Sequence, residues 1–465
     1  MPQILARYAP ENREDFELYK TELDDRNKVM SKAWRYYEGD HDKFFTPDGR
    51  GVDFNVTVNI TSQAVDKMVA FFAPETPRIV VQDGEDRVGL LTEVSKSGTQ
   101  LLIDAIWETN DKDEFIQDLA QSGFISGHSF VKITNPSQGL PKFNIIDPRN
   151  VTIFWNINNA KQVLYYRLTW KVSDDTSIIQ DIVPNWLFAN QNLIDPVDVL
   201  AGWTLIQYEV KTGKFKQIGM SEWDFPFSPI VAWKNSPYAH KVYGLSDLRH
   251  LNLNDTLNFI KGNTNKILYH HGGPQTIVTG AALDDMEKKK SGVSTIMEFP
   301  DPNTKVFNLE LKSDLKSSQG IADDIRAAFF GQTRVVDMAQ IRDNLARVTN
   351  FGVRMIHGDM MDMITTRRKV YGKGISRMTQ IAAFLANDVG ALNKNIDVIF
   401  SDPLPVDRLS EVSALATEAE ISTLSQQTIA HDLKRDFGTE VTNLEEEEAA
   451  GLTKEPEEKD NPFEQ

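Results

Sequence analysis

The sequence predicts an α+β protein, because three stretches of the chain carry different hydrophobic periodicities. From about residue 11 to 125, apolar side chains recur at the spacing of amphipathic helices. From about 128 to 235, short β-branched and aromatic runs alternate with Pro, Gly, Asn and Asp, as in antiparallel strands joined by turns. After residue 245, helical patterns return and flank a segment of short strands. A chain of 465 residues can bury one large core or several small ones.

The first stretch predicts amphipathic helices that pack against a neighbouring sheet. One stripe of Val65, Met68 and Phe72 ends at Pro74, and the helical pattern then continues up to Gly123. The longest stripe comes before it and consists of Phe16, Tyr19, Leu23, Met30, Trp34 and Tyr37.

The strand region is unusually rich in tryptophan. A row of exposed aromatic rings would suit base stacking, but aromatic side chains on strands are mostly core or cross-strand partners. We therefore interpret these residues as core. They are Trp155, Trp170, Trp203, Trp223 and Trp233.

The third stretch predicts a helix, a small β module and a second helix. Ser246 and Asp247 can cap a helix at 246–272, which Gly272, Gly273 and Pro274 stop. At 1.5 Å per residue this helix is roughly 40 Å long, which suits a spacer better than a small core. Its apolar side carries Leu257, Ile260, Ile267 and Leu268, and its other side carries several Asn. In the second helix, Ile321, Ile325 and Ala328 share a face from which Asp323 and Asp324 point away.

A very long helical pattern follows at 351–385. Four glycines, Gly352, Gly358, Gly372 and Gly374, weaken it and predict a bend. The run NIDVIFSDPLPVD then predicts a strand that returns to the β region, and further helices precede an acidic, disordered tail.

Composition narrows the function classes. The net charge of -17 disfavours a tight DNA-binding module, yet it is compatible with a surface past which DNA slides. Cysteine is absent, which removes thiolate metal sites and Cys nucleophiles. No secretion signal or membrane-length apolar run occurs, so we expect a soluble protein that is not secreted by that route.

The motifs of common enzymes are missing or fragmentary. No G-x-x-x-x-G-K-[ST] loop is present, and GKGIS at 372–376 lies inside a helical pattern, where a kink is the better interpretation. The adjacent His270 and His271 point about 100° apart on a helix and lack a third metal ligand. The sequence therefore predicts no catalytic, cofactor-binding or metal-binding residues and no enzymatic activity.

Four phrases in a fixed order give a more specific indication. They are SGHSFVKIT, FNIIDPRNVTIFW, the run from SPIVAWKN through GLSDLRHLNLNDTLNFIKGNTNKILYHHGGPQTIVTG, and near the C-terminus SDPLPVDRLSEVSALATEAEISTLSQQTIAHDL. Their order resembles that of the portal, or head-tail connector, proteins of tailed bacteriophages. The likeness extends from about residue 30 to 448.

The resemblance implies a portal-type fold with a helical and β-rich wing, a two-helix stem, a small β clip, a long kinked helix and a helical crown. It divides the chain into the wing at 1–245, the first stem helix at 246–272, the clip at 273–312, the second stem helix at 313–331, the tunnel loop at 332–349, the kinked helix and wing return at 350–406, the crown at 407–448 and the acidic tail at 449–465.

The resemblance also implies a function. Portal subunits form a dodecameric ring at the unique capsid vertex of the virion, assembled in the bacterial host cytoplasm, through which double-stranded DNA is packaged and ejected without sequence specificity. The implied partners are the terminase large subunit, head-tail adaptor proteins, and the major capsid and scaffolding proteins, with no membrane. Two other functions remain open: a DNA-processing enzyme of the packaging machinery, such as a nuclease, and another minor head protein.

Charged residues of the implied channel and clip are the candidate sites. Acidic side chains would keep the wall from holding phosphates, and arginines would place cations near the narrowest point, although each is equally well an ordinary surface or intersubunit charge. The clip lysines are candidates for partner docking. The channel candidates are Asp314, Asp323, Asp324, Arg334, Arg342 and Arg347, and the docking candidates are Lys288, Lys289 and Lys290.

Overall fold

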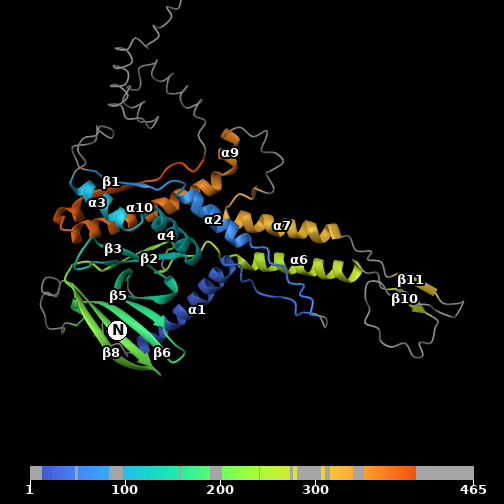
Figure 1. The fold of residues 1–465 in the computed structure, drawn as a ribbon, viewed down its shortest axis with the longest axis horizontal. Helices are drawn as coiled ribbons and strands as arrows, with labels where there is room; N and C mark the ends of the chain where they lie inside the picture. The colour runs from blue at the N-terminus through green and yellow to red at the C-terminus, as the bar shows by residue number, and fades with distance from the viewer. Residues whose placement is uncertain are drawn as a thin grey trace, which may run out of the picture.

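The computed structural model describes residues 13–47, 51–82, 98–156, 159–188, 202–239, 241–272, 276–279, 305–308, 315–338 and 350–404. Helices and sheets form a body from which one long pair of helices projects (Figure 1). This mixture confirms the predicted α+β class. No helix within the described ranges has the length and apolar character needed to cross a membrane.

The N-terminal helices form the centre of the core. They are α1 (Arg13–Tyr37), α2 (Ile60–Phe72), α3 (Gly98–Thr109) and α4 (Lys112–Ser126). Asn59 caps α2 by accepting a hydrogen bond from the Ser62 backbone N–H at 3.0 Å. Met68 and Phe72, from the predicted stripe, are fully buried.

One strand was missed in this helical region. Residues Arg78–Gln82 form β1, which pairs antiparallel with β12 (Asn395–Ile399) near the end of the described chain. The prediction of helices throughout 11–125 was wrong here, because a five-residue edge strand is too short to establish a period of two. The partner strand returns to β1 and not to the β region at 128–235.

The β region is antiparallel, as predicted. A three-stranded sheet has the order β3-β2-β9, and a five-stranded meander runs from β4 to β8. The strands are β2 (His128–Thr134), β3 (Lys142–Ile146), β4 (Val151–Asn156), β5 (Asn159–Lys171), β6 (Thr176–Pro184), β7 (Trp203–Lys211), β8 (Lys214–Trp223) and β9 (Ile230–Lys234). In the described ranges, short 3₁₀ helices lie at Pro148–Asn150, Asn185–Phe188 and Val389–Asn393.

Most of the tryptophans of this region pack into the core. Trp223 and Trp233 are buried, and Trp155 and Trp203 pack against the core from its edge. Trp170 is the exception and is 37% exposed. Their burial leaves no row of free rings for base stacking among these five residues.

The long C-terminal helical pattern consists of two helices. A short α9 (Asn350–Ile356) is followed by His357, after which α10 (Gly358–Leu385) begins. Gly372 and Gly374 were expected to weaken the helix, but both lie inside α10 without interrupting it. At Gly374 a β-carbon would lie 2.5 Å from the Trp233 ring, so close packing explains this glycine better than a bend does.

The projecting pair consists of α6 (Leu251–Gly272) and α7 (Leu315–Thr333). They lie side by side, and the two-stranded sheet of β10 (Thr276–Thr279) and β11 (Lys305–Asn308) lies beyond their far ends (Figure 1). The chain has the predicted order of a helix, a small β module and a second helix, and their assignment as stem and clip stays a prediction. The crown at 407–448, the acidic tail and most of the clip lie outside the described residues.

Candidate functional site

The projecting pair of helices, here called the stem, carries two of the candidate channel residues. Asp323 and Asp324 are both exposed on α7. Arg334 lies just after the end of α7. The other candidates, Asp314, Arg342, Arg347, Lys288, Lys289 and Lys290, lie outside the described residues.

The stem exposes large apolar side chains along its length. Phe259 is 44% exposed, Leu268 50% and Tyr269 42% on α6, and Ile321 is 53% exposed on α7. Of the predicted shared face of α7, Ile321 and Ala328 are exposed and Ile325 packs partly buried against the core, while α7 buries Ala322, Phe329 and Phe330. Apolar spacing alone does not identify which of these residues the fold buries.

Buried asparagines anchor α6 to the body. Asn254 and Asn258 are fully or almost fully buried, although the sequence pattern placed the Asn residues on the polar side. Asn254 accepts from the Thr61 hydroxyl at 3.0 Å and donates to the Val58 carbonyl at 3.0 Å. Asn258 accepts from the Val58 backbone N–H at 2.9 Å. These bonds tie the stem to the start of α2 by polar contacts that are fully satisfied in a buried setting.

His41 completes this anchor. Its Nδ1 accepts from the side-chain amide of Asn258 at 2.9 Å, so its Nε2 carries the proton and donates to the Tyr36 carbonyl at 3.1 Å. Burial lowers the pKa of His41, which favours this neutral form. The sequence gave no motif for this residue, because its partners lie far away in the chain.

A charged group lies beside the anchor. The Lys32 ammonium donates to Asp255 at 2.9 Å and lies 3.1 Å from Asp42. Burial opposes the charge on Lys32, but the hydrogen bonds to Asp255 and Asp42 outweigh burial and raise its pKa. The Tyr36 hydroxyl also donates to Asp255. The first turns of α6 are therefore held from α1 by ionic contacts as well.

The end of α7 has a specific cap. The Arg334 N–H donates to the Gly331 carbonyl at 3.2 Å, and the Val335 N–H donates to the Phe330 carbonyl at 3.1 Å. Arg334 has a φ of +57°, the left-handed conformation that this Schellman motif requires and that glycine usually supplies. The buried Val335 follows, and the Lys67 ammonium donates to the Val336 carbonyl at 2.8 Å. The first residues of the predicted tunnel loop are thus fixed to the body.

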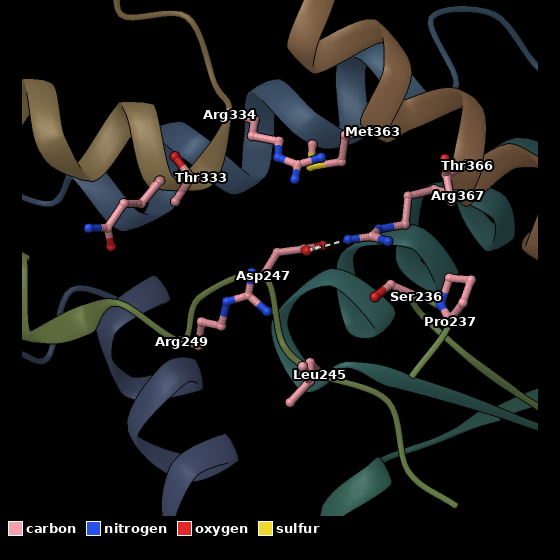
Figure 2. Close-up of a pocket in the computed structure, with 11 residues that line it drawn as sticks. Ser236, Pro237, Leu245, Asp247, Arg249, Thr333, Arg334, Met363, Thr366 and Arg367 are labelled. Atoms are coloured by element: carbon pink, nitrogen blue, oxygen red, sulfur yellow. Dashed lines mark hydrogen bonds and ion pairs between the residues drawn. The ribbon is translucent and has the colours of Figure 1, made fainter. Parts of the chain in front are cut away.

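A cavity of about 220 Å³ opens where the stem meets the body. Its lining comes from the β9–α6 connection, the end of α7 and the helix α10 (Figure 2). Three arginines, Arg249, Arg334 and Arg367, share this cavity with one carboxylate, that of Asp247. Only Arg334 of these residues was a candidate from the sequence.

Asp247 and Ser246 do not cap α6 as predicted. Asp247 accepts from Arg367 at 2.5 Å and from the Asn235 amide at 2.6 Å. Ser246 accepts from the Leu248 N–H at 3.0 Å and donates to the Ile125 carbonyl. The helix starts only at Leu251, because these two side chains join the connection to α4, β9 and α10 instead.

The described part of the chain contains no group of three or more His, Asp or Glu side chains placed to hold a metal ion. Asp323 and Asp324 do not converge with other carboxylates there. The arrangement offers exposed charge, exposed apolar surface and a cationic cavity.

Comparisons with known proteins bear on this arrangement. Residues 5–181 match the family model described as phage portal protein, SPP1 Gp6-like. No curated protein matches the sequence.

Several solved structures are similar in outline. The neck of a native GTA particle computed with C12 symmetry is 13% identical with a TM-score of 0.45, covering 81% of this chain and 89% of that one. The virion of a native gene transfer agent particle is 11% identical with a TM-score of 0.46, covering 87% and 93%. The match of residues 5–181 to the SPP1 Gp6-like phage portal family agrees with the family that the sequence resembles.

Proposed function

We propose that this chain assembles into a closed ring, dodecameric in the capsid, whose central passage conducts double-stranded DNA. The observation that carries the proposal is the exposed apolar surface of the stem, at Phe259, Leu268, Tyr269 and Ile321. A helix pair with so little core of its own is stabilised when identical neighbours cover it, and cyclic symmetry supplies the same neighbour to every subunit.

The proposed position is the unique vertex of the virion, with assembly in the host cytoplasm. The β10–β11 end of the stem lies farthest from the body and offers a docking surface for the terminase large subunit and later for head-tail adaptor proteins (Figure 1). The body contacts major capsid and scaffolding proteins. The ring is a structural conduit, and the DNA is driven by a separate motor.

The charge of the protein supports the passage of DNA without tight binding to the wall. Asp323 and Asp324 are exposed on α7, and the whole chain carries a net charge of -17. Acidic side chains on a passage wall repel phosphates and release no counterions, so they weaken sequence-independent binding. Asp314 would extend this acidic surface, whereas Arg334, Arg342 and Arg347 would place a few cations beside the DNA.

The stem surface can be tested by charge substitution. In the full chain, Leu268→Glu and Ile321→Glu should abolish high-order particles in mass photometry, because a carboxylate cannot be buried between neighbouring stems. Val389→Glu is the matched control, since Val389 is 74% exposed in the short helix after α10. Rings that persist in both stem variants would contradict the proposed interface, and circular dichroism checks that the body stays folded.

Lys288, Lys289 and Lys290 are proposed to help attach the motor or adaptors. Changing all three to Glu should leave the ring intact and impair attachment, because rim charges mainly alter association rates and partner choice. DNA packaging and tail joining by the variant are the readouts. Normal packaging and joining would remove the docking role, and loss of the ring would assign these lysines to a subunit interface.

The alternative functions have distinct tests. A nuclease predicts magnesium-dependent cleavage of DNA by the purified protein, with loss of cleavage after a point substitution within the chain. Another minor head protein predicts a particle without a ring. We expect neither cleavage nor ATP hydrolysis.

A further inference from the structure

We propose that the cavity at the root of the stem binds a phosphate group. The ligand chemistry is a tetrahedral oxyanion, which either free inorganic phosphate or the DNA backbone can supply. The backbone source rests on the proposed function, whereas binding of the phosphate group does not.

The cavity has the size and charge for such a group. Its volume of about 220 Å³ far exceeds the roughly 10–15 Å³ that one water molecule needs. Arg249, Arg334 and Arg367 contribute three positive charges and Asp247 one negative charge, which leaves the lining with a net charge of +2. This excess occurs in a chain whose overall charge is -17. An anion is the ligand that such a lining attracts.

The carboxylate of Asp247 is fully engaged. One of its oxygens accepts from Arg367 at 2.5 Å and the other accepts from the Asn235 amide at 2.6 Å. Arg249 donates its Nε–H to the His250 ring at 3.2 Å, and neither Arg249 nor Arg334 forms an ion pair with the described part of the chain. Their charges are therefore left for a ligand.

A buried donor of Arg367 also lacks a partner. The side chain is only 8% exposed, and its Nε–H is buried without a hydrogen bond to any described residue. Figure 2 shows Arg367 reaching from α10 toward Asp247, with Arg249 and Arg334 on either side of that carboxylate. An unsatisfied buried guanidinium N–H is costly, so Arg367 occupies its place in the cavity lining at an energetic penalty.

The backbone at Arg334 adds a second indication. Arg334 occupies a left-handed position where glycine is the usual residue, and its side chain lines the cavity. Such backbone strain persists where the side chain has a function or the surroundings enforce it. An arginine at this position places in the cavity lining a guanidinium group that glycine would lack.

The threonine hydroxyl groups of the lining do not compete for this role. Thr333 donates to the Phe329 carbonyl at 3.0 Å, and Thr366 donates to the Asp362 carbonyl at 3.1 Å, so both use their protons within their own helices. The guanidinium groups remain as charged donors for a ligand, beside the neutral Ser236 hydroxyl and Gln332 amide. The planar guanidinium forks match the oxygens of a phosphate in two-point hydrogen bonds.

Calorimetric titration of the full chain with inorganic phosphate tests binding, with ionic strength held constant by sodium chloride. The wild type should bind phosphate, and the double variant Arg249→Gln, Arg334→Gln should bind it at least about tenfold more weakly, since charge-assisted hydrogen bonds are lost. Arg377→Gln is the control, because Arg377 is exposed on α10 outside the cavity lining. The control should bind phosphate as the wild type does.

Specific outcomes would overturn the proposal. They are no heat of binding in the wild type, equal affinity in the double variant, or equal affinity for acetate, which would make the cavity a carboxylate site. Unchanged melting of the double variant without phosphate excludes simple misfolding. Both arginines have exposed side chains, so we expect the fold to tolerate the change.

Fluorescence anisotropy with a short DNA duplex distinguishes the two sources. If the backbone is the source, the double variant binds the duplex more weakly than Arg377→Gln does, and inorganic phosphate competes with the duplex. If duplex binding is the same in both variants while phosphate binding differs, the ligand is free phosphate. Ring formation is measured separately by mass photometry. A failure to bind phosphate therefore does not count against the proposed ring, and a failure to form rings does not count against the phosphate site.

Discussion

The guanidinium group of Arg326 on α7 holds the carboxylate of Asp337 in a two-point ion pair, with Nε–Oδ2 at 2.6 Å and Nη2–Oδ1 at 3.1 Å. Asp337 lies after the end of α7, and its side chain is only 5% exposed. The pair turns the chain back along the helix that it has just left. The position of the segment that follows the stem is therefore set by a residue within the stem.

Removing this carboxylate should destabilise the protein. For Asp337→Ala we expect the free energy of unfolding to fall by about 2 kcal/mol, because the partly buried Arg326 loses a charged partner. Asp25→Ala removes an exposed pair with Lys28, whose side chains are 72% and 78% exposed, and should cost under about 1 kcal/mol. Urea unfolding of both variants provides the measurement. Equal losses of unfolding free energy in the two variants would show that the Arg326–Asp337 pair stabilises the fold no more than an exposed pair does.

Arg334→Gly should have the opposite effect on stability. Glycine adopts the left-handed conformation without strain, so we expect a gain of up to about 1 kcal/mol in the free energy of unfolding. Phosphate binding should weaken at the same time, because one guanidinium leaves the cavity. A stability loss would mean that the Arg334 side chain contributes more to folding than its backbone strain costs. Thermal unfolding together with phosphate titration checks both parts.

The buried ion pair of Arg167 and Asp181 predicts a non-additive mutant cycle. The two residues lie directly opposite on β5 and β6, their side chains are 3% and 0% exposed, and two bonds of 2.7 Å join them. Asp181→Ala should cost about 3–5 kcal/mol, since it removes the carboxylate that neutralises a buried guanidinium group. The double replacement Arg167→Met, Asp181→Leu should recover most of that loss. Urea unfolding of the single and double variants measures this recovery. A double variant as unstable as Asp181→Ala would contradict the prediction.

His128 should make the protein sensitive to acid. Burial, and then the charges of Arg26 and Lys234, lower the pKa of His128 to about 3 from an ordinary value of 6.5. Above pH 6.5 the histidine is neutral in both states and costs nothing. As the pH falls from 6.5 toward 3, His128 binds a proton in the unfolded chain but not in the folded chain. The free energy of unfolding therefore decreases by up to about 1.4 kcal/mol per pH unit.

The variant His128→Asn isolates this effect. Asparagine can still accept the Gly244 N–H that His128 Nδ1 accepts at 3.3 Å, but it does not titrate. Urea unfolding of both proteins near neutral pH and near pH 5 should give a smaller pH dependence for the variant. The same slope in both proteins would show that His128 is protonated without cost in the fold.

Two glycines of α10 should respond oppositely to alanine. Gly374→Ala places a β-carbon 2.5 Å from the buried Trp233 ring and should cost several kcal/mol, because the ring has no room to move. At Gly372 the nearest atom would lie 3.9 Å away, so Gly372→Ala should stabilise the helix by about 0.5–1 kcal/mol. Thermal melts of the two variants provide the comparison. Destabilisation of similar size in both would contradict it.

The sequence predicted the elements better than it predicted their faces. Strand periodicity and turn residues located the antiparallel region correctly, because each strand repeats its pattern over several residues. The stem helices also lie close to the predicted ranges. Yet Asn254 and Asn258 are buried while Leu268 and Ile321 are exposed, the reverse of the usual distribution. On a projecting helix, burial depends on which neighbour reaches it, and that information is tertiary.

The candidate site was predictable only in part. The acidic pair Asp323 and Asp324 follows from helical spacing, and their exposure is as expected. Arg249 and Arg367 could not be found, because they are more than a hundred positions apart and carry no motif. The position of Asp247 predicts a helix cap, but its partner is Arg367 on α10. Long-range partners decide these roles, and a single sequence does not contain them.

Direct imaging of the purified full-length protein tests the central claim, which is that identical subunits form a closed ring through their stems. Negative-stain class averages should show closed particles with a central hole and the stems gathered around the axis. A strictly monomeric mass over varied salt and protein concentration, with no ring in the images, would contradict the account.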